Sequence, residues 1–363
     1  MPTFHSMKEV PYEINAGAKL LFVGEAPGEE EEYSGLPFQG KAGQRLNIGI
    51  ERCGKRRDDA HYCNLSRRRP YLNNLPYIFK TKEFKEDLNT LAEVIESLDP
   101  AIIVTLGAWP TYFLNGYNDG GSLEPQRGMP GFTKPEFGAR LTIPTYHPSF
   151  IERAQGFNQH TIFYSDLKRA FNLSEDPSLY GWKHETLTNP EGNDLHRMLD
   201  LMYTNPTSVD IETFMGTKLA CIGFCPDVSV GMCITYQASP HTFKLIHEYM
   251  ADASANKTFQ FGNFDVIWLQ RFADMTTRGY TWDTYIASAT LMPEFSRSLN
   301  FLQSIYTYFP YHKDDRKNHK EGGNIQTLWD YNVCDVVSTQ TISLHQMEEM
   351  KNEYGSAELG KVA

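Results

Sequence analysis

Four carboxylates and one tyrosine in the second half of the chain have the types and spacing of a two-metal site. Asp210 and Glu212 lie in TSVDIETF, whose strand-like pattern sends both side chains to the same side. Asp265 stands at the start of a predicted helix, and Tyr331 and Asp335 share one face of another. Carboxylate oxygens suit Mg²⁺ or Mn²⁺, and two ions ~3.5–4 Å apart can drive phosphodiester hydrolysis. We therefore predict that the four acids bind two metal ions.

Three segments in the first half of the chain carry polar or aromatic residues directly after predicted strands. They are GEAPG (24–28) together with PFQG (37–40), then Asn64 in HYCNLSRRRP, then HPS (147–149). Open α/β sheets bind ligands at the carboxyl ends of their strands. Each segment alone is also typical of an ordinary turn or of a satisfied polar residue. The prediction of a binding pocket therefore depends on their occurring together.

The elements that must position these residues indicate two α/β domains. In the first, buried strands are predicted at 19–23, at 101–106 and in LTIPT before His147. GQRLNIGIERCG reads as a helix closed by Gly54, and TIFYSDLKRAFNL has helical periodicity. A polar stretch with Pro and Gly follows, so we place the domains at 1–174 and 175–363.

The second domain restarts the pattern of helices and strands. DLHRMLDLMY predicts an amphipathic helix, and SVDIETF, KLACIGFCP and VGMCITY predict a meander of three strands. The remainder reads as mixed α/β.

The motifs of the first domain resemble, in order and spacing, the uracil-DNA glycosylase superfamily, above all its family 4. They are GEAPG, GLPFQGKAG (35–43), Asn64, LGAWP (106–110) and HPS, within about residues 18–173. The resemblance implies an α/β/α sandwich with a parallel sheet. It implies that Phe38 stacks on an extruded base, Asn64 bonds the uracil edge and His147 stabilises charge on uracil O2. Glu25 would orient water or stabilise the sugar cation. Four further motif residues would bind the substrate: Gly24, Ala26, Pro27 and Ser149.

One feature departs from family 4, whose members hold an iron-sulfur cluster with four cysteines. The stretch that resembles their KCRP sequence is here Arg67-Arg68-Arg69-Pro70, and the first domain holds only Cys53 and Cys63. Four thiolates cannot be assembled, so no such cluster is expected. The glycosylase chemistry is then kept, weakened or lost.

The acids of the second domain resemble the three motifs of DEDDy 3′-5′ exonucleases, which have an RNase H-like fold with a mixed sheet. DT (283–284), MPEFSRSLNFLQSIYT and LWDYNVCD resemble the proofreading domain of phage-type family A DNA polymerases, over about residues 180–345. The resemblance implies that Tyr331 orients the attacking water. Phe261 stands where relatives usually carry an Asn, which puts substrate positioning in doubt. Only 28 residues follow Asp335, so a separately encoded DNA polymerase is the expected partner.

Composition sets the remaining expectations. The formal net charge is -11, but residues 41–85 hold twelve Lys or Arg against four acids, a local +8 that predicts a phosphate-facing surface including Arg68. A solvated charged face is the alternative. The six cysteines are read as free thiols. The sequence has neither an 18-residue apolar run nor the pattern of a signal peptide, so a cytoplasmic location without a membrane partner is expected. If the gene belongs to a phage, this is the cytoplasm of the host cell.

Three functional hypotheses follow from these patterns. The first is a DNA 3′-5′ exonuclease joined to a domain that excises or senses uracil. In the second, the first domain is a non-catalytic module that docks DNA or a polymerase. In the third, the exonuclease acts on RNA.

Overall fold

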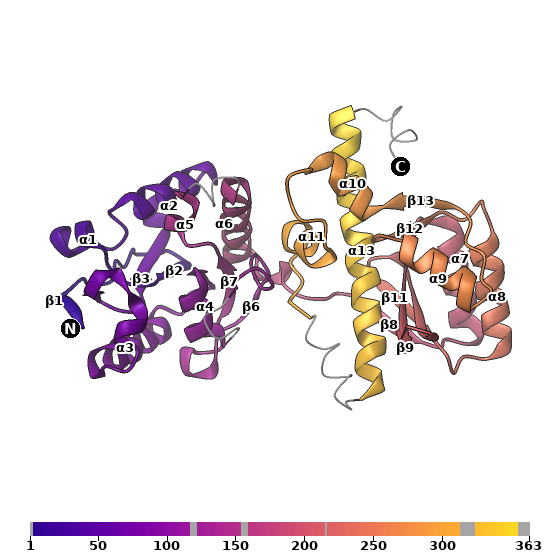
Figure 1. Cartoon of the computed structure of the whole chain (residues 1–363), viewed down its shortest axis with the longest axis horizontal. Helices are drawn as coiled ribbons and strands as arrows, with labels where there is room; N and C mark the ends of the chain where they lie inside the picture. The colour runs from indigo at the N-terminus through magenta and orange to yellow at the C-terminus, as the bar shows by residue number, and fades with distance from the viewer. Residues whose placement is uncertain (1–2, 117–121, 154–158, 215, 313–323, 355–363) are drawn as a thin grey trace. The chain divides into compact units, whose positions relative to one another are not determined.

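The computed structural model describes residues 3–116, 122–153, 159–214, 216–312 and 324–354. The chain forms two compact units, Met1–Gly181 and Trp182–Ala363 (Figure 1). The expected boundary at 174/175 falls in the last turn of helix α6 (His160–Glu175), and the division at Gly181/Trp182 lies within the polar stretch that follows it. Within the described ranges, no helix has both the length and the apolar character needed to cross a bilayer.

The first unit is built on a five-stranded sheet. Its order is β3-β2-β5-β7-β6, and the first four strands are parallel while the edge strand β6 is antiparallel. The strands are β2 (Leu20–Gly24), β3 (Ala60–Asn64), β5 (Ile102–Leu106), β6 (Gly131–Phe132) and β7 (Leu141–Thr145). The α/β fold with a parallel sheet is confirmed, with one antiparallel edge strand added.

Helices cover both faces of this sheet, because alternate residues of each buried strand point to opposite sides. Leu21, Val23 and Ile103 pack on the side of α3 and α4. On the other side, Phe22 meets Phe171 of α6, and α6 packs against α2 (Figure 1). The helices are α1 (Glu29–Ser34), α2 (Lys41–Arg52), α3 (Lys82–Leu98), α4 (Ala108–Asn115) and α5 (Pro148–Ile151).

A small two-stranded sheet lies beside this sandwich. Strand β1 (Phe4–Glu9) pairs antiparallel with β4 (Arg68–Pro70), which follows the end of β3. Residues 68–70 of the RRRP stretch are therefore a strand, and pairing with β1 fixes its backbone position.

The second unit contains a six-stranded mixed sheet of order β13-β12-β9-β10-β11-β8. Neighbouring β9, β10 and β11 are antiparallel, which confirms the predicted meander, and the other pairs are parallel. The strands are β8 (Glu185–Thr188), β9 (Thr207–Phe214), β10 (Lys218–Asp227), β11 (Val230–Thr235), β12 (Lys257–Phe259) and β13 (Tyr280–Asp283).

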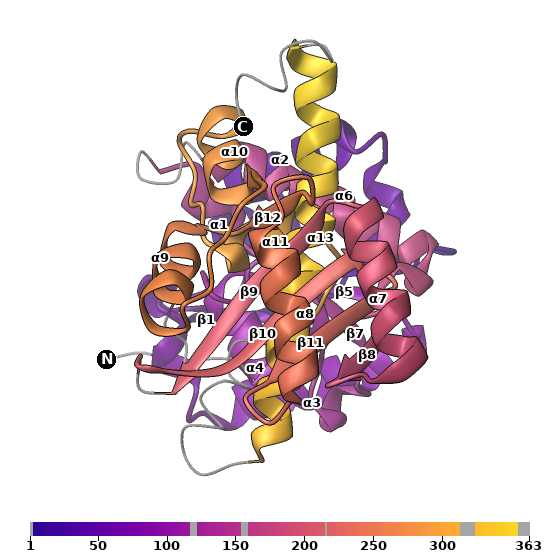
Figure 2. The same cartoon turned by 90° about the vertical axis from the view of Figure 1, so that its right-hand side faces the viewer.

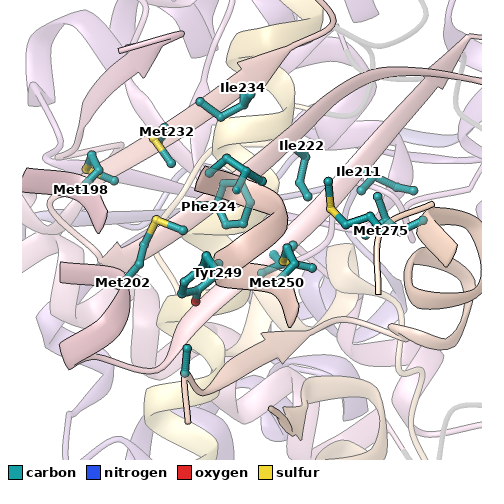
Figure 3. Packing of buried hydrophobic residues seen from close by; sticks show 14 of the residues in the cluster. Met198, Met202, Ile211, Ile222, Phe224, Met232, Ile234, Tyr249, Met250 and Met275 are labelled. Atoms are coloured by element: carbon teal, nitrogen blue, oxygen red, sulfur yellow. The ribbon is translucent and has the colours of Figure 1, made fainter. Parts of the chain in front are cut away.

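One face of this sheet packs on three helices, and the other packs on a single long helix (Figure 2). The first face holds the main core of the unit, where Ile222 and Phe224 of β10 meet Met202, Tyr249 and Met250 (Figure 3). The helices are α7 (Gly192–Thr204), α8 (Pro240–Ala251), α9 (Asn263–Phe272), α10 (Thr284–Leu291), α11 (Leu299–Tyr306) and α13 (Ile325–Tyr354).

Strand alternation decides which side of β9 carries its acids. Val209 and Ile211 belong to the core with α7, α8 and α9. Asp210 and Glu212 therefore point to the opposite face, which α13 covers. The cysteines follow the same rule: Cys221, Cys225 and Cys233 pack against α13 as free thiols, as predicted.

Candidate active sites

The first site forms where strands β2 and β3 end side by side. Gly24 pairs in register with Asn64, and both are the last residues of their strands. A methyl group added to Gly24 would lie 2.5 Å from Asn64 Oδ1 and 2.6 Å from Phe38 Cζ. The side chains of Asn64 and Phe38 therefore converge over Gly24, and only glycine leaves them room.

These side chains line a pocket of about 540 Å³ together with most of the residues singled out in the sequence. Glu25 follows β2, and His147 follows β7 and precedes α5. The structure thus brings the three predicted loops together. The lining includes Glu25, Ala26, Pro27, Phe38, Asn64, His147 and Ser149.

The loop that presents Phe38 is held in a strained conformation. Phe38 has φ +53°, which non-glycine residues seldom adopt. Gly43 of α2 packs directly on the Phe38 backbone, and a Cβ there would overlap the Phe38 carbonyl. Two oxygens of the buried Glu31 side chain accept N–H groups of Gly28 (2.9 Å), Gln39 (2.8 Å) and Gly40 (2.8 Å). The sequence did not single out Glu31, because it is one of four consecutive glutamates.

Burial sets the protonation of the two ionisable groups in this pocket. It raises the pKa of Glu25 to about 7, although the positive charge of Arg153 opposes the shift. It lowers the pKa of His147 to about 4, so this ring is neutral at physiological pH. The Ser149 N–H donates to His147 Nδ1 (3.2 Å), which places the ring proton on Nε2. Glu25 is thus poised as a base and His147 as a neutral hydrogen-bond donor.

Arg68 does not lie on a DNA-facing surface, contrary to our expectation. It is only 8% exposed, and its guanidinium pairs with Asp87 (2.8 Å) and with Glu9. Arg67 donates to Asp87 as well (3.0 Å), and Asp87 is fully buried. Arg67 and Arg68 therefore form the cationic part of an ion cluster with the buried Asp87 and the exposed Glu9, which joins β4, α3 and β1.

The predicted basic surface over residues 41–85 is also largely neutralised. Acids from other segments, absent from the local count, pair with several of its cations. These pairs are Arg45 with Glu152, Lys55 with Glu175, Arg57 with Glu13 and Arg69 with Glu32. The local excess of +8 overstated the free charge, because it counted only neighbours in sequence.

The residues of the first unit do not fit an iron-sulfur cluster. Cys63 lies in the core on β3, and Cys53 caps the end of α2. These are the two cysteines of residues 1–181, where a cluster would need four thiolates.

The second site lies between strand β9 and helix α13. Oxygens of Asp210, Glu212 and Asp335 all lie within 4.8 Å of one another. Tyr331 and Asp335 are one turn apart on α13, as their spacing predicted. Asp265 belongs to the first turn of α9, and its Oδ1 accepts the Ile211 N–H (3.2 Å). The structure therefore brings three of the four predicted acids into one group and places the fourth beside the same strand.

The electrostatics of this site are those of crowded acids. Burial, and then the charges of Asp265, Asp335 and Glu212, raise the pKa of Asp210 well above its ordinary range. Burial raises the pKa of Asp265 to about 7. Such a group gains from divalent cations, which offset the mutual repulsion.

Tyr331 is buried beside these acids and stays protonated. Burial, and then the charges of Asp335, Glu212 and Asp210, raise the pKa of Tyr331 far above its ordinary value. Its hydroxyl can therefore donate as well as accept a hydrogen bond.

Three further residues support this site. The sequence singled out Asp283 only as part of the DT pair and did not single out Asn332 or His312. Asn332 donates to Asp210 Oδ2 (2.9 Å), and His312 Nε2 lies 2.9 Å from Asp335 Oδ1. Asp283 accepts the N–H groups of Phe261 (3.0 Å) and Gly262 (2.9 Å) just before α9. Asn332 directly follows Tyr331 on α13, but neighbouring residues of a helix point in different directions, so the spacing of Tyr331 and Asp335 did not indicate it. His312 is a lone histidine in a loop and gave no signal.

Comparisons with known proteins match the first half of the chain to a family. A family model for the uracil DNA glycosylase superfamily matches residues 11–172. A type-4 uracil-DNA glycosylase of Thermotoga maritima is 35% identical over 159 residues, which are 44% of this chain and 79% of the relative. A type-4 uracil-DNA glycosylase of Saccharolobus solfataricus is 38% identical over 146 residues, which are 39% of this chain and 65% of the relative. The solved Nibbler EXO domain of Aedes aegypti is 10% identical and covers 50% of this chain and 99% of its own, with a TM-score of 0.41.

Proposed function

Because this chain belongs to the uracil-DNA glycosylase superfamily through its first unit, we propose that this unit excises uracil from DNA. The observation that carries the proposal is the convergence of Glu25, Phe38, Asn64 and His147 on one pocket. A module that only docked DNA or a polymerase would need none of these four groups in that arrangement.

The chemistry follows from the residue types. An extruded base needs an aromatic surface, which Phe38 supplies, and an amide that reads its edge, which Asn64 supplies. Breaking the glycosidic bond leaves negative charge on the base, and a neutral His147 with its proton on Nε2 can donate to it. Glu25, with a pKa of about 7, is partly ionised at neutral pH and can orient the attacking water.

A cleavage assay tests this proposal. An end-labelled single strand with one uracil is incubated with the protein in EDTA, and abasic sites are then cleaved with alkali. We expect release of uracil but not of thymine or cytosine, because protein dipoles and not metal ions serve this step. If uracil is neither released nor bound in preference to thymine, the docking-module hypothesis takes its place.

For the second unit we propose a metal-dependent 3′-5′ exonuclease, so that the whole chain is a hydrolase acting on nucleic acid. The carboxylate group of Asp210, Glu212 and Asp335 supports this proposal. These three with Asp265 would hold two Mg²⁺ or Mn²⁺ ions, which supply water activation and charge stabilisation when bound.

The chain's own residues then position the reaction. Asn332 holds Asp210 by its amide, and His312 holds Asp335, so both carboxylates keep one orientation. Tyr331 keeps its proton and can orient the attacking water by a hydrogen bond.

The test of this second activity is trimming of a 5′-labelled single strand in Mg²⁺. We expect stepwise shortening from the 3′ end, which EDTA abolishes and which the double change Asp210→Ala and Glu212→Ala removes. Undiminished trimming by this double variant would contradict the metal site.

We propose DNA as the substrate of both sites and a separate DNA polymerase as a partner. The segments DT (283–284) and LWDYNVCD, which resemble polymerase proofreading domains, support DNA over RNA. Trimming rates on DNA and RNA strands of one sequence distinguish the two substrates, and faster trimming of RNA would favour the RNA exonuclease.

A further inference from the structure

Phe261 is an exposed aromatic residue held in a strained conformation at the edge of the proposed nuclease site. It is 51% exposed and has φ +59°, an outlier for a bulky side chain. The buried carboxylate of Asp283 fixes this backbone by accepting the N–H groups of Phe261 and Gly262. The Asp283 carboxylate thus holds the backbone in the conformation that leaves the Phe261 ring exposed.

The ring of Phe261 belongs to a row that ends in a positive charge. Its centroid lies 4.9 Å from that of Tyr285, at an interplanar angle of 50°. The guanidinium carbon of Arg297 lies 5.4 Å from the Tyr285 ring centroid. Gln260 donates its side-chain amide to the Arg297 carbonyl (2.8 Å) and so ties the end of the row to its start.

This row adjoins the acids of the second site. Asp265 follows Phe261 by four residues, and the exposed Phe264 lies between them on the first turn of α9. Asp283 connects the row to this site, since it accepts the Phe261 N–H and its charge acts on Asp265. A strand that reached the carboxylates from this side would pass beside the ring of Phe261. The positive charge of Arg297, next to the aromatic surface, would then attract the phosphates of that strand.

We propose that Phe261, Tyr285 and Arg297 form a stacking platform for an unpaired nucleobase of a single strand bound in the second site. The proposal rests on the proposed exonuclease function and names how that site holds its substrate. Aromatic faces stack on any base, and a guanidinium adds charge attraction without reading sequence. Phe261 stands at the position where related exonucleases carry an amide side chain. It offers an apolar contact in place of that amide.

A fluorescent base analogue tests the platform directly. Single strands carrying 2-aminopurine near the 3′ end are titrated with the full chain in Ca²⁺, and the quenching that stacking causes is followed. We expect quenching with the wild type and with Phe261→Trp. Phe261→Ala should lose most of it and bind about 5- to 100-fold more weakly, which corresponds to one lost stacked base.

Ile267→Ala is the matched control, since Ile267 is 63% exposed on α9, the helix that follows Phe261, and lies outside the row. It should bind and trim like the wild type. DNA and RNA strands are run side by side, and loss of quenching with either strand in Phe261→Ala supports the platform and shows which strand it holds. Equal binding and quenching by the Phe261→Ala and Ile267→Ala variants would overturn the platform, provided the wild type trims strands in Mg²⁺. A wild type that does not trim in Mg²⁺ contradicts the exonuclease itself.

Discussion

At the scale of single residues, Asn64 is the sharpest probe of the first pocket. Its side chain meets Phe38 over Gly24, where an amide could read a base edge. Replacing Asn64 by Ala leaves the polar edge of a bound uracil unpaired, which costs about 1–3 kcal/mol. We expect Asn64→Ala to lower discrimination for uracil over thymine about 10- to 100-fold in competitive cleavage. Asn73→Ala is the control, because Asn73 lines the same pocket while its side chain is held by Arg69.

Glu25 makes the stability of the first unit depend on pH. Its pKa in the folded protein is about 7, above the ordinary 4.5, so the folded state binds the proton more tightly than the unfolded state. This contribution is fully present below pH 4.5 and is lost as pH rises through 7. Relative to Glu25→Gln, the wild type should lose up to ~3 kcal/mol of unfolding free energy between these values. Denaturant unfolding at a series of pH values measures the difference, and parallel curves would contradict the raised pKa.

At the scale of secondary structure, the contact of helix α2 with the Phe38 loop leaves no room for a side chain at Gly43. Gly43→Ala should force the helix and the loop apart and displace Phe38. We expect the unfolding free energy of the unit to fall by about 1–3 kcal/mol. Uracil release should fall along with the thermal midpoint. Gln44→Ala, one residue along on the exposed side of α2, is the control and should change neither.

The ion cluster between β4, α3 and β1 stabilises the first unit. Removing one member of a buried ion group leaves its partners uncompensated, at about 3–5 kcal/mol. We expect Asp87→Ala, and to a lesser degree Arg68→Ala, to lower the unfolding free energy by amounts of this order. The salt dependence of DNA binding should stay unchanged, because Arg68 is buried. A weaker salt dependence of DNA binding in the Arg68→Ala variant would contradict this, because it would mean that Arg68 contacts DNA phosphates.

The elements were largely predictable, and the pairing of charges was not. Strand alternation and helix periodicity located β2, β5, β9 and α7, because local apolar patterns determine which face is buried. Motif order predicted which loops meet at the first pocket. Arg68 was misassigned because its partners Glu9 and Asp87 are distant in sequence. Asn332 and His312 were missed for the same reason, since each acts through a contact with a distant carboxylate. Glu31 was missed because it stands among four consecutive glutamates.

At the scale of the whole molecule, each site draws its residues from one unit. We therefore expect the two activities to respond independently in the intact chain. Asn64→Ala should leave trimming in Mg²⁺ unchanged, and the Asp210→Ala, Glu212→Ala double variant should leave uracil release in EDTA unchanged. Both activities are measured on one strand with an internal uracil. Loss of both from a single-site change would mean that the sites depend on each other.

The ligands of the second site also set an order of events during synthesis. Asp210 and Asp335 lie 125 residues apart (335 minus 210), on β9 and on the long helix α13. Chains emerge from the ribosome N-terminus first, and domains generally fold as units in that order. The residues from Glu25 to His147 are therefore available to form their pocket well before Asp335 has been translated. The proposed base-binding pocket can therefore form before the proposed metal ligands are complete, so the second site matures last.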